Sequence, residues 1–140
     1  MRSTTKRMTS AGARIAVAAV ATAGALLTSL VAAPSASAAV RYCPGTTAWC
    51  AQVTGINSGS RLLMRVDPYY GSEVTGVRFN GDWLHLECWT TGDADADGHG
   101  YRYWMLVSGV GGGDQPIGYV NDWYLDSGGY AQWSKVISHC

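Results

Sequence analysis

Turn-forming residues recur so closely after residue 40 that they limit what this chain can fold into. Gly, Asn and Asp interrupt the sequence at short intervals, and the runs between them are rich in β-branched and aromatic residues. No segment after residue 40 keeps an amphipathic helical period for about three turns. Short runs between turns are typical of small all-β barrels and sandwiches. We therefore predict an all-β fold.

One run, "WLHLECW" at Trp83–Trp89, alternates as a half-buried strand does. Successive side chains of a strand point to opposite faces of the sheet. One face is expected in the core and carries Leu84, Leu86 and Cys88. The other face is expected to be partly exposed and carries Trp83, His85, Glu87 and Trp89.

Four further strands are expected around this one. They lie at about 62–66, 74–79, 101–107 and 116–125, with turns at Asp67-Pro68 and Asn80-Gly81. Asn-Gly is a strong hairpin signal. Residues 39–49 are predicted to be an N-terminal segment, 50–126 the β domain, and 127–140 a C-terminal tail held down by its final cysteine.

The first 38 residues have the pattern of an export signal. A basic leader precedes an alanine-rich apolar run from Ile15 to about Val31, and "ASA" at 36–38 supplies small residues for signal peptidase. The alternative is an uncleaved membrane anchor, since the run is nearly long enough to span a bilayer. We expect the leader to be cleaved. The chain is then predicted to be secreted, extracellular or associated with the cell wall, with no stable membrane anchor.

Removal of this leader changes the charge balance. Four of the ten basic residues lie within it, so the remaining 102 residues carry six basic against ten acidic side chains, net −4. Nucleic-acid phosphates require a basic face, which argues against a nucleic-acid partner.

All four cysteines lie after the leader: Cys43, Cys50, Cys88 and Cys140. An even number in a small exported domain predicts two disulfides, and three pairings are possible. We favour Cys43–Cys50, which closes a short loop easily, with Cys88–Cys140, which ties down the end of the chain. The spacing contains no CxxC pair, so no zinc site is predicted.

The stretch "DADADGHG" at 93–100 begins like a calcium loop. Asp93, Asp95, Asp97 and Gly98 occupy its first, third, fifth and sixth positions, but Trp104 stands where a bidentate glutamate is required. Strands flank the stretch instead of helices. We interpret it as a solvated insertion in a hairpin, with weak calcium binding as the alternative. We predict no metal site and no cofactor.

Four segments in order resemble the bacterial SH3-type domain: "LLMRVDP" (62–68), "VTGVRFNGD" (74–82), "WMLV" (104–107) and "GYVNDWYL" (118–125). The resemblance covers about residues 50–126. The matching positions are Arg65, Pro68, Gly81, Asp82, Trp104, Gly118 and Tyr119. The chain departs from the family in having Tyr119 instead of tryptophan, a long insertion between Trp89 and Trp104, the disulfides and the tail.

The resemblance implies a small SH3-like barrel of about five short strands and a binding function without catalysis. Domains of this type are commonly attached to exported cell-wall enzymes, where some hold peptidoglycan peptides or cross-bridges. The expected partner is therefore peptidoglycan, a cell-wall peptide or another secreted protein.

Six Trp, eight Tyr and one Phe all follow the leader, more than a domain of this size is expected to need for its core. Aromatic rings can line a groove that holds a peptide or sugar by its apolar faces. The candidate ligand-binding residues are Tyr69, Tyr70, Trp104, Trp123 and Tyr124. For Trp104 a place in the core is the favoured alternative, because barrels this small use aromatic residues for packing.

An inhibitor of an extracellular hydrolase is the alternative function. Small all-β proteins with two disulfides can present a rigid loop to an active site. "YRYW" at 101–104 is similar in composition to the Trp-Arg-Tyr triplet of the tendamistat-type amylase inhibitors. The chain order and cysteine spacing do not match that family.

Overall fold

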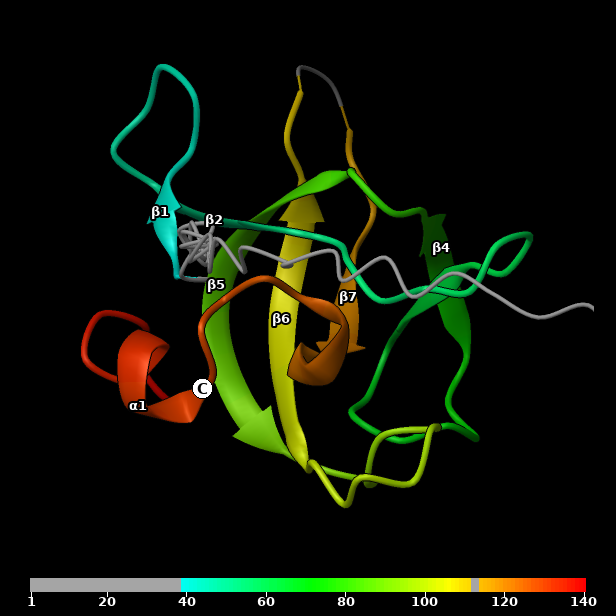
Figure 1. Ribbon diagram of the computed structural model, residues 1–140. Coiled ribbons are helices and arrows are strands. Elements are labelled where there is room, and N and C mark those ends of the chain that lie inside the picture. The colour runs from blue at the N-terminus through cyan, green and yellow to red at the C-terminus, as the bar shows by residue number, and fades with distance from the viewer. Residues whose placement is uncertain (1–38, 112–113) are drawn as a thin grey trace, which may run out of the picture. The chain divides into compact units, whose positions relative to one another are not determined.

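The computed structural model describes residues 39–111 and 114–140; the predicted signal peptide lies outside this range. Within the described residues the fold is mostly β, with seven antiparallel strands in one sheet (Figure 1). The strands are β1 (Arg41–Tyr42), β2 (Trp49–Gln52), β3 (Leu62–Arg65), β4 (Val74–Arg78), β5 (Trp83–Thr91), β6 (Tyr103–Gly109) and β7 (Ile117–Asn121). A 3-10 helix, η1 (Asp122–Tyr124), follows β7, and a short helix, α1 (Tyr130–Trp133), lies near the C-terminus.

The strand order is β1-β2-β5-β6-β7-β3-β4, so the meander β5-β6-β7 forms the centre of the sheet. The all-β prediction is confirmed, and the five predicted runs correspond to β3–β7 with ends shifted by a few residues. β1 and β2 were not predicted because runs of two and four residues are too short to display an alternation. The last of these strands, β7, ends at Asn121 and not at about residue 125, because η1 begins at Asp122.

A β-bulge between Leu86 and Cys88 changes the faces of β5. Leu86 pairs with Val107, whereas the next pair is Cys88 with Leu106. An extra residue in one strand shifts the alternation by one position. Trp89 therefore packs against the core, and the prediction that Cys88 shares the core face with Leu86 is wrong.

The C-terminal segment is part of the core. Trp133 is fully buried and Ile137 is 3% exposed. The Trp133 ring lies 5.3 Å from that of Trp89 and 5.5 Å from that of Tyr103. These rings and Tyr130 form an aromatic cluster, so a part of the aromatic surplus serves packing.

Both disulfides form in the favoured pairing. Cys43–Cys50 closes a loop next to β2, and Cys88–Cys140 joins β5 to the last residue. The end of the chain is also hydrogen-bonded to β5, because Cys140 N–H donates to Trp89 O (2.9 Å). Two disulfides are typical of proteins in an oxidising, extracellular environment.

The loop between β5 and β6 meets the segment between β3 and β4 at one end of the sheet (Figure 1). Asp93 N–H donates to Pro68 O (3.0 Å), and Tyr70 N–H donates to the Asp93 carboxylate (2.9 Å). Gly92 allows this approach, because a Cβ at position 92 would overlap the Pro68 carbonyl. Both connections contribute residues to one cavity, Asp97 from the β5–β6 loop and Tyr70 from the β3–β4 segment.

Candidate functional site

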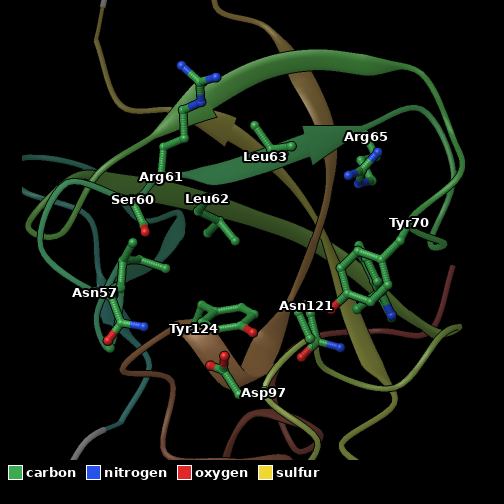
Figure 2. A pocket seen from close by; sticks show the side chains of 14 residues that line it. Asn57, Ser60, Arg61, Leu62, Leu63, Arg65, Tyr70, Asp97, Asn121 and Tyr124 are labelled. Carbon is green, nitrogen blue, oxygen red and sulfur yellow. The ribbon is translucent and has the colours of Figure 1, made fainter.

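A cavity of about 300 Å³ opens between β3, the acidic loop at 93–100 and η1 (Figure 2). We call this cavity the groove. Its walls combine aromatic rings with amide, hydroxyl and charged side chains. The lining residues are Gly55, Ile56, Asn57, Ser60, Arg61, Leu62, Leu63, Arg65, Tyr70, Ala96, Asp97, Trp104, Asn121 and Tyr124.

Three of the five candidate residues come together in the groove: Tyr70, Trp104 and Tyr124. The rings of Tyr70 and Trp104 meet edge to face, with centroids 5.3 Å apart. Trp104 is only 1% exposed, and its indole N–H donates to Asp93 O (2.8 Å). Trp104 therefore serves as the floor of the groove, and Tyr70 and Tyr124 offer more of its contact surface.

The 3-10 helix η1 separates two neighbouring aromatic residues. Asn121 accepts from Trp123 N–H (3.0 Å) and so caps the start of η1. With about three residues per turn, consecutive side chains point in well-separated directions. Tyr124 enters the groove, whereas Trp123 is 43% exposed and stacks on His99 with centroids 3.9 Å apart.

Tyr69 and Trp123 lie outside the groove. Tyr69 is 47% exposed. Trp123 lines a separate hollow together with Tyr101 and Asp122. Of the two adjacent tyrosines, Tyr69 therefore faces solvent and Tyr70 lines the groove.

The acidic loop is a wall of the groove, and its three carboxylates have different partners. Asp93 accepts from Tyr70 N–H, while buried Asp95 accepts from the backbone N–H groups of His99 (2.9 Å) and Tyr101 (2.6 Å). Asp95 also contacts the His99 ring (2.8 Å), and Asp97 is hydrogen-bonded to the Tyr124 hydroxyl. Hydrogen bonds to backbone N–H groups and side chains in and next to the loop therefore hold it in this conformation.

Among the described residues, one group of at least three metal-ligating side chains has its ligand atoms within 4.8 Å of one another: Cys43, Cys50 and His85. The two cysteines form a disulfide and hold no thiolate for a metal. The carboxylates at 93, 95 and 97 do not form such a group.

The groove shifts the pKa values of both its tyrosines upward. Burial raises the pKa of Tyr124 to about 12, and the hydrogen bond and negative charge of Asp97 act in the same direction. Burial also raises the pKa of Tyr70, where Ala96 N–H and Arg65 oppose the shift and Asp95 and Asp93 reinforce it. Both hydroxyls are therefore protonated donors at neutral pH.

Charged side chains line the groove on two sides. Arg65 donates to Ser72 O (2.7 Å), and its guanidinium lies 5.7 Å from the centre of the Tyr70 ring. Asp97 lies beside Tyr124 on the other side (Figure 2).

Most of the remaining lining was not predicted from the sequence, including Asn57, Ser60, Arg61 and Leu63. Their stretch, "INSGSRLL", contains only ordinary turn and strand signals. Asp97 was noticed in the sequence for its charge but not connected with the tyrosines.

Residues 101–104, which an inhibitor would present to an enzyme, mostly make contacts within the chain. Of residues 101–104, only Arg102 is exposed. Tyr101 donates to Asp122 (2.8 Å), and Tyr103 stacks on Tyr130 with centroids 4.7 Å apart.

Comparison with protein-family models, curated proteins and solved structures finds no match for this chain. Helices long and apolar enough to cross a membrane are absent from the described part of the chain.

Proposed function

We propose that the chain, once its leader is removed, is a secreted binding module that holds a cell-wall peptide in the groove. The observation that carries the proposal is the convergence of Tyr70, Trp104 and Tyr124, all selected from the sequence, on one cavity. The proposal includes an SH3-like barrel and assigns no reaction to the chain.

The composition of the groove supports a peptide ligand. A cavity of about 300 Å³ is at the lower end of the range for small-molecule sites, which suits one or two residues of an extended chain. Tyrosine and tryptophan rings pack on apolar parts of a ligand, and their O–H and N–H groups orient its polar parts. Asn57 and Ser60 add an amide and a hydroxyl to the wall.

The resemblance to the bacterial SH3-type domain supports the cell wall as the source of that peptide. Two of the matching positions, Arg65 and Trp104, line the groove. The predicted signal peptide and the two disulfides are consistent with a place of action outside the membrane.

Co-sedimentation with purified peptidoglycan sacculi tests the proposal. Tyr69 and Tyr70 provide a matched pair, because they are adjacent and differ in whether they line the groove. We expect the mature chain to pellet with sacculi, Tyr70→Ala to lose most of this binding, and Tyr69→Ala to keep it. Thermal unfolding of each variant separates lost binding from lost folding.

Three results would count against the proposal. The mature chain could stay in the supernatant at low salt, or the two variants could lose binding equally. Capture of an exported protein from culture supernatant, without binding to sacculi, would indicate a protein partner instead.

A further inference from the structure

We infer that the groove selects peptides that carry an ammonium group and a carboxylate, with the ammonium at Asp97 and the carboxylate at Arg65. This inference rests on the proposed function and names the ligand chemistry of the same site. It is carried by the opposite charges that line one small cavity.

Asp97 is the carboxylate of the acidic loop that faces the groove. Asp95 is buried and is occupied by His99 and Tyr101, and Asp93 is held by Tyr70 N–H. Asp97 is exposed and receives the Tyr124 hydroxyl, which occupies part of its acceptor capacity. An ionised carboxylate has about four lone-pair sites on its two oxygens, so it can accept further donors from an ammonium group.

The aromatic surroundings of Asp97 favour an organic cation over a hydrated ion. Tyr124 is 7% exposed and lies against Asp97, with Leu62 also lining this part of the cavity (Figure 2). Ring faces attract cations, and the CH₂ groups next to an ammonium pack on apolar surface. A lysine-like or amino-terminal ammonium meets both conditions.

Arg65 is the cation on the opposite wall. Its Nη1 atom donates to Ser72 O, and the guanidinium is placed next to the Tyr70 ring. These contacts hold the guanidinium in place, and a guanidinium has five N–H donors, so one backbone contact leaves others for a ligand. Arg61 extends away from the cavity in Figure 2 and is exposed, so we assign the carboxylate to Arg65.

Chemically modified sacculi test this assignment. Acetylation of the wall amines removes their positive charge, and amidation of the wall carboxyls removes their negative charge. We expect each treatment to raise the concentration for half-maximal binding of the wild-type chain by about 10-fold, the effect of losing one charge-assisted hydrogen bond.

Two variants connect each charge with its residue. With Asp97→Asn, binding to untreated sacculi should weaken by about the same factor, and acetylation should cause no further loss, because the two changes remove one interaction. Arg65→Gln should behave in the same way toward amidation. Glu73→Gln is the control, since Glu73 is exposed and outside the groove.

The outcomes separate this inference from the proposed function. If wild-type protein binds treated and untreated sacculi equally, the charge assignment is wrong and the binding function stands. Acetylation that weakens wild type and Asp97→Asn equally would also overturn the assignment to Asp97. If untreated sacculi are not bound, both proposals fail.

Discussion

Asp95 is the residue whose replacement tests the account of the acidic loop. Its carboxylate is buried and receives His99 N–H, Tyr101 N–H and the His99 ring. Burial alone would raise the pKa of Asp95, but the hydrogen bonds from His99 and Tyr101 lower it from 3.8 to about 2. The ionised carboxylate therefore stabilises the folded chain.

The size of this effect follows from the two pKa values. The difference between 3.8 and about 2 corresponds to about 2.4 kcal/mol when Asp95 is fully ionised. Solvent around His99, whose side chain is 46% exposed, screens the interaction, which reduces the contribution to about 1–2 kcal/mol. Because the folded-state pKa is the lower one, this contribution is present above about pH 4 and is lost as pH falls from 4 to 2.

Urea denaturation of Asp95→Asn measures the contribution. We expect the free energy of unfolding at pH 7 to fall by about 1–2 kcal/mol, because asparagine places an NH₂ group against one of the N–H donors. The difference in free energy of unfolding between wild type and variant should narrow toward pH 2, where about half of the wild-type carboxyls are protonated. Glu73→Gln, at an exposed carboxylate, should leave the free energy nearly unchanged.

Either of two results would show that the ionised Asp95 carboxylate does not stabilise the folded chain. One is equal stability of wild type and Asp95→Asn at pH 7. The other is a stability difference that stays constant from pH 7 to pH 2.5, since that would mean that the carboxylate charge has no part in it.

Three further variants test the packing of the fold around the groove and at the C-terminus. Gly92→Ala should be destabilising by about 1–3 kcal/mol, because its Cβ would meet the Pro68 carbonyl, whereas Gly71→Ala should be nearly neutral; equal melting temperatures for the two variants would contradict this. Trp133→Ala should cost about 3–5 kcal/mol in urea denaturation, and a loss below about 1 kcal/mol would mean that the C-terminal segment is not core. Replacing Cys88 and Cys140 together by alanine opens a loop with a sequence separation of 52 residues, and should cost about 4 kcal/mol in the same measurement; an unchanged denaturation midpoint would contradict the tie between β5 and the C-terminus.

The features that could be predicted from the sequence are those set by short-range chemistry. The disulfide pairing followed from the ease of closing a short loop between Cys43 and Cys50. The strands β3–β7 followed from alternation and turn residues, since both are visible within a few positions. The aromatic surplus, together with the resemblance to the bacterial SH3-type domain, led to Tyr70 and Tyr124 as candidate ligand-binding residues, and both line the groove.

The features that could not be predicted depend on contacts distant in sequence or on one irregular backbone step. The bulge after Leu86 turned Trp89 toward the core. No residue type in "LECW" indicates that the strand contains an extra, unpaired residue. The cap at Asn121 began a 3-10 helix where a strand was expected, which separated Trp123 from Tyr124. The acidic loop became part of the groove through its contact with the segment at Pro68, 25 residues earlier than Asp93.

The most direct test of the binding claim is a map of where a wall peptide contacts the chain. Solubilised peptidoglycan fragments are titrated into ¹⁵N-labelled mature protein, and backbone and indole N–H signals are followed. We expect shifts at Tyr70, at Asp97 and at the Trp104 indole N–H, with the Trp123 indole N–H unaffected. Shifts confined to the hollow beside Trp123, or saturable binding to sacculi with no shift at any groove residue, would contradict binding in the groove.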